Sequence, residues 1–464
     1  MDKMKNISMI AEQYYDKYRD YVDLYEKKSV KSQIEGKIRE EDVYALGKQL
    51  EQTEGYIKFV EANGSKGDLG VLPNIALDVV VASAAQSPIP LMASIQPIEE
   101  EKGTIYYKAV EAGSTRGNVN KGDILQDSIN GRKKVESGFA GEHIIGEVEA
   151  TGDGTATTFN FTVKYAPILK RTLTVYVAGT NVKLVDDGQG NLIGIGGQGT
   201  VNYETGSVTV SFTNAPAKDA EIVADYDSNF EAMTEIPTVR TTFESLSVQA
   251  RVYALRTEIG LFKSYSMSKR FGMNVEEVLA QDLTQELTTE VSANVVSTAY
   301  LNAVGETHWD KKTPSGISYT EHKLTFFDAI ANAESEILKN AGRLNGAPVL
   351  IVGNKVAAII RTLPGFKPAP NVNAVLGTHF YGTLEGKVVI RSIVLPENEA
   401  LLVAKGSTMF DAGLVYAPYL PLFVTDTYHG MDHNPLNGQK AVALEAAIAA
   451  PVKTLITKLV VDNA

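Results

Sequence analysis

The sequence predicts an α+β protein into which a small all-β domain is inserted. Between residues 148 and 228, short runs alternate polar and apolar residues and are separated by Gly, Asn and Asp turns. From Val275 to Val304, Leu and Val instead recur at helical spacing, which predicts one long helix. Residues 305–464 alternate helix-like and strand-like segments. Together these patterns indicate a mixed fold with an inserted β unit.

Composition limits the classes of function. With 464 residues the chain can form two or three domains around a substantial core. A formal net charge of −12 argues against binding nucleic acid by neutralising its phosphates, although it allows the protein to lie beside DNA. The absence of cysteine excludes disulfides, thiolate nucleophiles and cysteine metal sites. No apolar run approaches the ~20 residues of a membrane helix and no signal peptide is evident, so we expect a soluble, intracellular protein.

Residues 1–66 predict two amphipathic helices, because tyrosines recur at helical spacing from Tyr14 to Tyr25 and aliphatic residues do so from Val43 to Val60. This segment is interpreted either as an arm packed on a neighbouring surface or as a propeptide or assembly segment. From residue 71 the sequence predicts short apolar strands. The polar stretch 118–143 predicts a long extended loop, and loops of this length are usually functional.

The glycines Gly194, Gly196 and Gly199 have the spacing of a dinucleotide-binding loop. Such a loop requires a following helix, whose N-terminus holds the pyrophosphate. Here a strand and a hairpin with its turn at 204–206 follow instead. We therefore expect these glycines to form positive-φ turns at a mobile hairpin tip and not to bind a nucleotide.

After the insertion, residues 241–262 alternate, which predicts a strand with Leu246, Val248, Ala250 and Val252 on one face. A short helix is expected to end at Gly272, and Asn274 to cap the long helix. In that long helix one apolar stripe is expected, formed by Leu279, Leu283, Leu287, Val291 and Val295.

Beyond residue 305 the order is an amphipathic helix closed by Gly342, a buried strand at 347–353, and a short helix capped by Asn354. Four strand-like runs follow, and their spacing predicts one mixed sheet flanked by these two helices. They span residues 387–395, 400–406, 413–426 and 440–451.

No constellation of residues predicts catalysis. His429, Asp432 and His433 lie close together, but Gly430 and Pro435 favour a loop over a zinc-binding helix. Residues 186–191 have the composition of a calcium loop without its spacing. Phosphate-binding, serine-hydrolase and metalloprotease motifs are absent from the sequence. We expect no enzymatic activity, no metal and no cofactor.

Two blocks, residues 247–296 and 380–422, resemble the major capsid protein of T-even-like tailed bacteriophages. The first matches the family's strand, glycine break and spine helix. The second carries a G-x-L-x-G turn followed by DAGxxYAPYxxL, and residues 72–90 resemble the segment that opens the family's mature chain. The motif residues in the second block are Gly382, Leu384, Gly386, Asp411, Ala412, Gly413, Tyr416, Ala417, Pro418, Tyr419 and Leu422.

This resemblance implies the Hong Kong 97-type phage capsid fold, with an N-arm, an E-loop, a P-domain built on the spine helix, and an A-domain. The expected divisions are a helical arm or propeptide-like segment (1–66), N-arm continuation, first P-domain strands and E-loop (67–147), inserted β domain (148–228), E-loop return and P-domain (229–310), A-domain (311–440) and C-terminal strands returning to the P-domain (441–464). The YAPYLPL run is expected at a rigid edge of the A-domain, near the capsomer axis.

The resemblance also implies a major capsid protein that self-assembles into the hexamers and pentamers of an icosahedral head around double-stranded DNA. Expected partners are further copies of itself and portal, scaffolding or decoration proteins, in a virion assembled in the bacterial cytoplasm. Relatives often lose an N-terminal segment by cleavage after Glu, and Glu61 is a possible site. Two alternatives stay open: an encapsulin-like compartment shell protein and a nucleotide-binding enzyme.

A local excess of basic residues in the polar loop suggests where subunits meet. We expect these side chains to contact acidic surface on a neighbour, such as Glu276 and Glu277. The residues are Arg116, Lys121, Arg132, Lys133 and Lys134.

Overall fold

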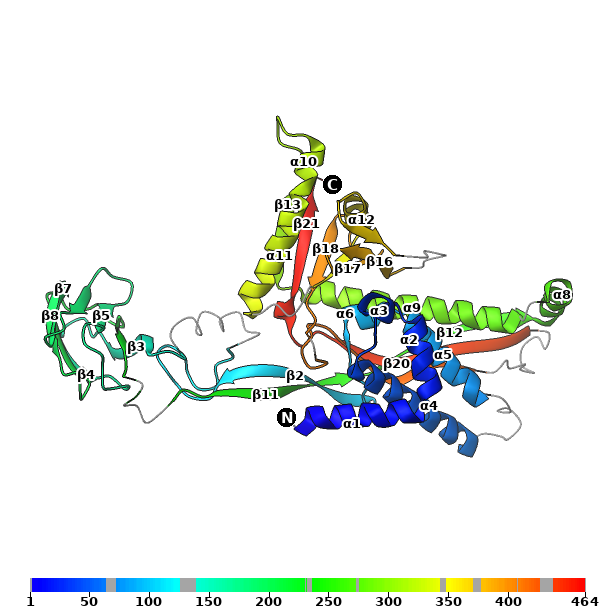
Figure 1. Ribbon diagram of the computed structural model, residues 1–464, viewed down its shortest axis with the longest axis horizontal. Coiled ribbons are helices and arrows are strands. Elements are labelled where there is room, and N and C mark those ends of the chain that lie inside the picture. Colours follow the sequence, from blue (N-terminus) through cyan, green and yellow to red (C-terminus); the bar gives the residue numbers. More distant parts are fainter. Residues whose placement is uncertain are drawn as a thin grey trace. The chain divides into compact units, whose positions relative to one another are not determined.

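The computed structural model describes residues 2–63, 72–125, 139–229, 231, 236–272, 275–342, 348–369, 377–406, 408–425 and 437–463. The chain divides into two compact units (Figure 1). Unit 1 comprises Met1–Lys108, Phe243–Leu338 and Arg343–Ala464, and unit 2 comprises Ala109–Thr242 with Lys339–Gly342. Helices and sheets both contribute to the chain, so the predicted α+β class is confirmed.

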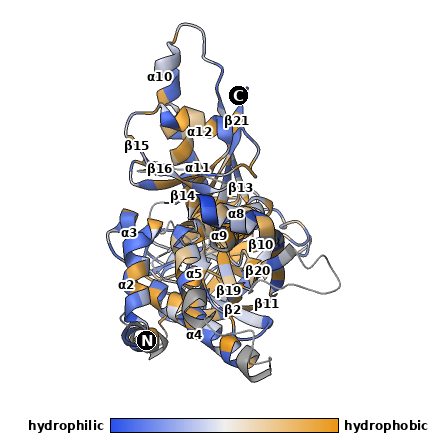
Figure 2. Cartoon of the chain, turned by 90° about the vertical axis from the view of Figure 1, so that its right-hand side faces the viewer, coloured by the Kyte–Doolittle hydropathy of each residue, from blue (hydrophilic) through white to orange (hydrophobic). Residues whose placement is uncertain are grey.

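Unit 1 begins with a group of helices around their own core. Four helices occupy the segment for which two were predicted: α1 (Asp2–Lys17), α2 (Arg19–Lys28), α3 (Val30–Glu35) and α4 (Glu40–Asn63). They alternate hydrophilic and hydrophobic stretches (Figure 2). Their shared core includes Tyr18, Val22, Tyr25, Leu46 and Leu50. The prediction was wrong about the number because the backbone leaves helical geometry at Tyr18 and again at Ser29, which divides the first predicted helix into α1, α2 and α3.

The segment after residue 71 is helical, where strands were predicted. It forms α5 (Leu72–Gln86) and the short α6 (Ile89–Met92). A continuous apolar run cannot be assigned to a strand or a buried helix by periodicity alone. Here Leu77, Val80 and Val81 are buried against the N-terminal helices, which favours the helix.

A four-stranded sheet forms the centre of unit 1. Its order is β1 (Ser94–Ile95), β19 (Val415–Val424), β20 (Asn437–Ala449) and β12 (Arg251–Gly260), so β12 is an edge strand. The long helix α9 (Val275–Asn302) packs on β12 and β20 (Figure 1). Its stripe is confirmed at Leu287, Val291 and Val295, which are fully buried, whereas Leu279 and Leu283 are half-buried.

A seven-stranded sheet forms the rest of unit 1. Its order is β13 (Gly305–Asp310), β21 (Ile456–Asp462), β18 (Glu399–Val403), β14 (Val349–Val352), β17 (Lys387–Arg391), β16 (His379–Leu384) and β15 (Phe366–Pro368). Its helices are α10 (Tyr319–Leu324), α11 (Phe326–Ala341) and α12 (Asn354–Arg361), and a short 3₁₀ turn (Lys453–Leu455) precedes β21. Gly353 caps α12, and Asn354 is its first residue and not its cap as predicted.

The single mixed sheet predicted for the last four runs is wrong. β17 and β18 lie in the seven-stranded sheet, whereas β19 and β20 belong to the four-stranded sheet. The C-terminal segment also divides, because β20 pairs with β12 while β21 pairs with β13 and β18. The spacing of strands along the chain does not determine which strands pair, because pairing depends on contacts between residues that are far apart in the sequence.

Unit 2 contains an antiparallel eight-stranded sheet. Its order is β3 (His143–Thr151), β10 (Glu221–Asp227), β5 (Thr174–Val177), β6 (Lys183–Asp186), β7 (Asn191–Ile195), β8 (Gly197–Val201), β9 (Ser207–Phe212) and β4 (Thr158–Thr162). Its core includes Leu173, Leu184, Leu192, Val208 and Ile222, all fully buried.

The G-x-G-x-x-G glycines belong to this sheet and not to a phosphate-binding loop. Gly196, with φ of 90°, forms the turn between β7 and β8, as predicted for a hairpin. Gly194 and Gly199 lie within the strands, where the prediction had placed turns. A Cβ at Gly194 would overlap the Lys183 carbonyl, and one at Gly199 would overlap that of Thr209. A strand, not a helix, follows Gly196, so the geometry of a dinucleotide loop is missing.

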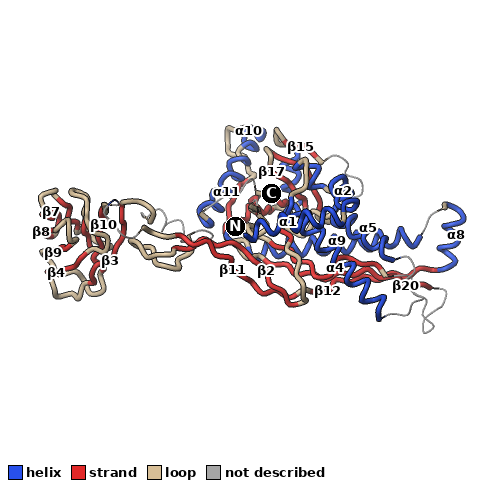
Figure 3. The backbone as a smooth tube through the Cα atoms, turned by 60° about the horizontal axis from the view of Figure 1, so that its bottom comes forward, coloured by secondary structure: helices blue, strands red, loops and turns tan. Residues whose placement is uncertain are grey.

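A strand pair and one further helix also belong to the described chain. β2 (Lys102–Ala112) and β11 (Val239–Gln249) form a two-stranded sheet, and α8 (Leu261–Phe271) follows β12 and ends at Gly272 as predicted (Figure 3). The face predicted for Leu246, Val248, Ala250 and Val252 is not one buried face. Ala250 is buried, but Leu246 is 39% and Val252 66% exposed, because the alternating run divides between β11 and β12.

Candidate assembly surfaces

The strand β11 and the start of β12 present apolar side chains to solvent. Along β11 nearly every side chain is exposed or half-exposed. Its exposed apolar residues include Val239, Phe243 and Leu246, and Val252 continues the series on β12. The Phe243 ring also contacts Phe410 edge-on, 5.3 Å away between centroids. Exposed apolar strands of this kind are surfaces that a partner usually covers.

Arg116, predicted to contact a neighbour, lies inside unit 2. Its side chain is 1% exposed and donates hydrogen bonds to the Gly141 carbonyl at 2.8 Å and to Ser228 Oγ at 3.2 Å. The guanidinium lies 5.1 Å from the centre of the Tyr165 ring, and burial lowers its pKa. This corrects the prediction, because a buried Arg116 holds its own unit together and presents no charge to a second subunit.

Of the other predicted contact residues, only Lys121 is described. Its side chain is exposed, and its backbone N–H donates to Thr115 Oγ1 at 3.1 Å. Arg132, Lys133 and Lys134 lie outside the described residues, as do Asn274 and the cluster His429, Asp432 and His433. The predicted partners Glu276 and Glu277 lie in α9, but their side chains are also outside the description.

The predicted G-x-L-x-G turn is the hairpin between β16 and β17. Leu384 is buried, while Glu385 and Gly386, with φ of 49° and 80°, form the two-residue turn. At Gly382 a side chain would meet the Phe366 ring 2.7 Å away, so this glycine allows β15 to approach β16.

The DAGxxYAPY segment lies at the four-stranded sheet, not in the seven-stranded sheet with Gly382 and Gly386. Asp411 is buried, and a Cβ built at Gly413 would lie 3.0 Å from Leu455 Cβ. Tyr416 is opposite Ile95 in the parallel pair of β1 and β19. Ile98 donates its N–H to the Pro418 carbonyl, and Tyr419 packs on the cluster around Ile98. The predicted A-domain edge is therefore a central strand on the sheet that α9 covers.

The N-terminal helices are tied to this same sheet. Gln52 Nε2 donates to the Ile98 carbonyl at 2.6 Å, Lys48 pairs with Glu99 at 3.1 Å, and the Tyr56 ring lies 5.0 Å from that of Phe423. Glu61, the possible cleavage site, lies in the last turn of α4, and its side chain is not described.

Sequence reasoning missed a half-buried lysine near these helices, Lys405. Lys405 Nζ donates to the Pro90 carbonyl at 2.8 Å and to the Ala93 carbonyl at 2.9 Å. Burial lowers the pKa of Lys405 to about 7. No local pattern marks this residue, because it follows an ordinary buried strand.

A second missed group is a pair of carboxyls in unit 2. Glu147 and Glu149 stand two residues apart on β3, and the Tyr226 hydroxyl donates to Glu147 Oε2 at 2.5 Å. Lys164 Nζ lies 3.7 Å from Glu147 Oε1. Burial and the neighbouring Glu147 raise the pKa of Glu149 to about 8. The spacing alone could have revealed the pair, because residues i and i+2 of a strand share a face.

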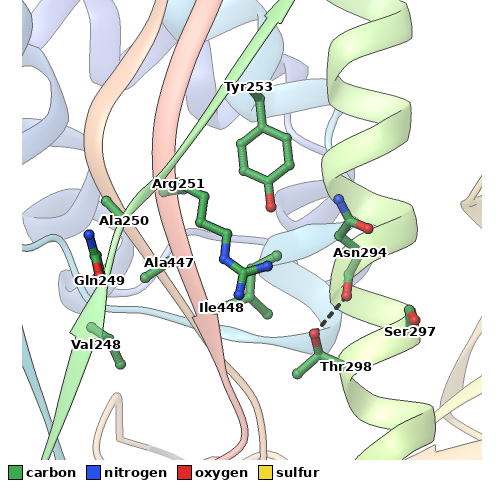
Figure 4. A pocket seen from close by; sticks show the side chains of 11 residues that line it. Val248, Gln249, Ala250, Arg251, Tyr253, Asn294, Ser297, Thr298, Ala447 and Ile448 are labelled. Atoms are coloured by element: carbon green, nitrogen blue, oxygen red, sulfur yellow. Dashed lines mark hydrogen bonds between the residues drawn. The ribbon is translucent and has the colours of Figure 1, made fainter. Parts of the chain in front are cut away.

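A cleft lies between α9 and the strands β12 and β20 of unit 1. Its volume is about 670 Å³, and its wall combines apolar residues with the side chains of Arg251, Tyr253, Asn294, Ser297 and Thr298 (Figure 4). In this view the Arg251 guanidinium and the Tyr253 hydroxyl point into the space beside α9. Thr298 Oγ1 donates to the Asn294 carbonyl at 2.8 Å.

The described part of the chain has neither a cluster of metal ligands nor a membrane-spanning helix. No three His, Asp or Glu side chains gather there as potential metal ligands. Among the helices described, none has both the length and the apolar character needed to cross a bilayer.

Comparison with solved structures finds phage-related particles at low identity. A protein of Microbacterium phage Oxtober96 is 12% identical, with 51% of this chain and 80% of that chain covered and a TM-score of 0.33. A chain of the bacteriophage PhiM1 mature capsid is 12% identical, with 51% and 78% covered and a TM-score of 0.33. A capsid chain of an empty GTA particle is 9% identical, with 68% and 88% covered and a TM-score of 0.34. Similarities of this size do not establish a shared fold.

The family comparison is decisive. A search of curated protein sequences finds no match. The model of the family described as major capsid protein Gp23, however, matches residues 74–452. This range includes both blocks that carried the resemblance in the sequence. The family match does not favour the two alternatives, a compartment-shell protein or a nucleotide-binding enzyme. The chain belongs to the Gp23 family of major capsid proteins.

Proposed function

We propose that copies of this major capsid protein form the hexamers and pentamers of an icosahedral phage head that encloses double-stranded DNA. The observation that carries the proposal is the exposed apolar series on β11 and β12, which a lone subunit leaves in water. The family assignment, the long helix α9 and the two-stranded β2–β11 sheet also support a subunit of the Hong Kong 97-type plan, with α9 as its spine.

The function follows from repeated contacts and needs no catalysis. When one surface of a subunit binds a different surface of the next, a rotation that closes produces a ring. Burying Leu246 and Val252 between subunits would contribute roughly 1.5–3 kcal/mol for each side chain fully removed from water. Summed over the many identical contacts of a ring, modest pairwise energies are sufficient for a stable shell.

Charged contacts are proposed to set the register between subunits. Lys121, with Arg132, Lys133 and Lys134 of the same loop, would contact acidic side chains of a neighbour such as Glu276 and Glu277. Reversing residues 132–134 to Glu is expected to block assembly while the monomer still folds. Particles of normal yield from this variant would contradict the contact.

Maturation is proposed to involve the N-terminal helices. Cleavage after Glu61 would remove α1 to α4 and uncover the part of the four-stranded sheet that Gln52 and Tyr56 now contact. The intact mass of subunits taken from mature particles tests this: a mass that begins after Glu61 supports it, and a full-length mass contradicts it.

The β sheet of unit 2 is proposed to brace neighbouring subunits or capsomers on the outside of the shell. Replacing residues 148–227 by a short linker should give shells that form but melt at lower temperature. Shells of unchanged stability would exclude a bracing role. Portal, scaffolding and decoration proteins are proposed as further partners, with assembly in the bacterial cytoplasm.

The direct test is whether the purified chain assembles. Sedimentation velocity and negative-stain imaging of the full chain are expected to show capsomers or closed shells at high concentration. A chain that stays monomeric at every concentration, alone and with the other head proteins of its phage, would contradict the proposed function.

A further inference from the structure

We propose that the cleft between α9, β12 and β20 is a binding site for a carboxylate side chain of a second copy of this chain, held by Arg251. The proposal rests on the proposed function, because it names a specific contact within the assembly. All residues that form the cleft belong to unit 1, so a single subunit presents it complete.

The charge of the cleft favours an anionic ligand. Arg251 is the one charged residue among those that line the cleft, and it is exposed. Within the described chain, no carboxylate lies within ion-pair distance of its guanidinium. Gln249 is already held by Glu101, whose Oε1 accepts from Gln249 Nε2 at 3.0 Å. The cleft therefore offers one positive charge without a counter-charge.

The wall of the cleft offers hydrogen-bond donors beside the charge. The Tyr253 hydroxyl and the Asn294 side-chain amide share the cleft with the guanidinium, and neither has a hydrogen-bond partner among the described residues. A planar guanidinium binds the two oxygens of a carboxylate in a fork, and the other two donors can complete its shell. Val248 and Ile448 add apolar wall that suits the methylene groups of a glutamate.

A second copy of this chain is the source of the carboxylate. The chain carries 56 acidic and 44 basic residues, so the surface of another copy is rich in carboxylates. The cleft also adjoins the exposed apolar series, because Arg251 directly precedes Val252, and Leu246 lies two residues before Val248. Successive side chains of a strand point to opposite faces, so Arg251 and Val252 lie on opposite faces of the same edge strand. A neighbour that covers this strand can reach both.

The first experiment compares two arginines of β12. Arg251→Gln is expected to raise the concentration needed for assembly at least tenfold, and Arg251→Lys, which keeps the charge but loses the fork, should raise it less. Arg256→Gln is the matched control, because Arg256 lies on the other face of β12 and contacts Gln439 Oε1 at 3.4 Å. It should assemble as the wild type does. Circular dichroism melts of the monomers establish that each variant folds.

The outcomes separate this inference from the proposed function. If wild type and Arg251→Gln assemble equally well into shells of equal stability, the inference is overturned and the proposed function stands. If the wild type never assembles, both are overturned. Stabilisation of the isolated subunit by millimolar citrate or phosphate, lost in Arg251→Gln, would instead assign the cleft to a free anion and overturn the assignment to a second copy.

The second experiment identifies the occupant. Tyr253 is replaced by p-benzoylphenylalanine in a mixture of ¹⁴N- and ¹⁵N-labelled subunits, which are assembled, irradiated and digested. The expected product joins labelled and unlabelled chains and includes a peptide with Asp or Glu. Cross-links that occur only within one chain, or that reach peptides without an acidic residue, would overturn the proposal.

Discussion

The Lys31 ammonium lies 2.6 Å from the Asp42 carboxylate, with side-chain exposures of 5% and 10%. The pair joins α3 to α4 in the N-terminal helical group, and Asp42 also accepts the Arg39 backbone N–H at 3.1 Å. Removing one member of a buried pair leaves the other charge uncompensated. Asp42→Ala should therefore lower the free energy of unfolding by about 3–5 kcal/mol in chemical denaturation of the monomer.

The exposed pair Arg19–Asp16 is the control for this prediction. Its side chains are both largely in solvent at a separation of 3.5 Å, so Asp16→Ala should cost less than ~1 kcal/mol. If the two aspartate variants lose the same free energy of unfolding, burial does not strengthen the contribution of the Lys31–Asp42 pair.

Two glycines of α4 should respond in opposite directions to alanine. Nothing lies within 4 Å of a Cβ built at Gly55, so Gly55→Ala should stabilise the helix by ~0.5–1 kcal/mol. At Gly47 the same atom would overlap the Tyr14 ring, and Gly47→Ala should destabilise by about 1–3 kcal/mol. Thermal melts of the two variants test the packing of α1 on α4. Stabilisation by both substitutions would contradict that packing.

Glu149 should make the stability of unit 2 depend on pH. Its pKa is raised from 4.5 to about 8, mainly by burial, so between these values the folded state binds more protons than the unfolded state. The contribution of Glu149 to the free energy of unfolding is therefore fully present below pH 4.5. It is lost as the pH rises towards 8. Between pH 6 and 9 the melting temperature should fall in the wild type and fall less in Glu149→Gln, which stays neutral.

The groups around Glu149 qualify this prediction. Glu147 and Lys164 face it, and burial, together with the charge of Glu147 and the hydrogen bond to it, also raises the pKa of Tyr226. Lys164→Met should therefore leave the pH dependence in place, because it removes a positive charge and not the proton that Glu149 holds. Identical pH profiles for wild type and Glu149→Gln would show that this carboxyl does not determine the dependence.

The exposed apolar series should matter more for assembly than for folding. Leu246→Ser and Val252→Ser change side chains that are 39% and 66% exposed, so each should cost the monomer less than the roughly 1.5–3 kcal/mol of a fully buried side chain. Assembly, measured by sedimentation, should weaken by roughly tenfold or more for the double variant, because each lost contact recurs at every copy. Leu301→Ser, at a side chain that is 77% exposed near the end of α9, is the control. An equal loss with Leu301→Ser would show that general surface apolarity, and not this strand, controls assembly.

Sequence patterns predicted the elements that depend on neighbouring residues. The stripe from Leu287 to Val295, the helix end at Gly272 and the hairpin turn at Gly196 are confirmed, because each follows from spacing within a few residues or from the conformation of one glycine. The apolar run Leu72–Gln86 was misassigned, because burial on several sides removes the alternation that distinguishes a strand from a helix.

Residue patterns along the chain were sufficient to predict the fold class, the long helix, several strands of unit 2 and, through two motif blocks, the family. The folded structure was needed to show that β19 pairs in a different sheet from β18, that Arg116 is buried, and that Arg251 faces a cleft. These features depend on contacts between residues that are distant in the sequence. Lys405 Nζ donates to the carbonyl of Pro90, 315 residues away, and no local pattern records a contact between residues so far apart.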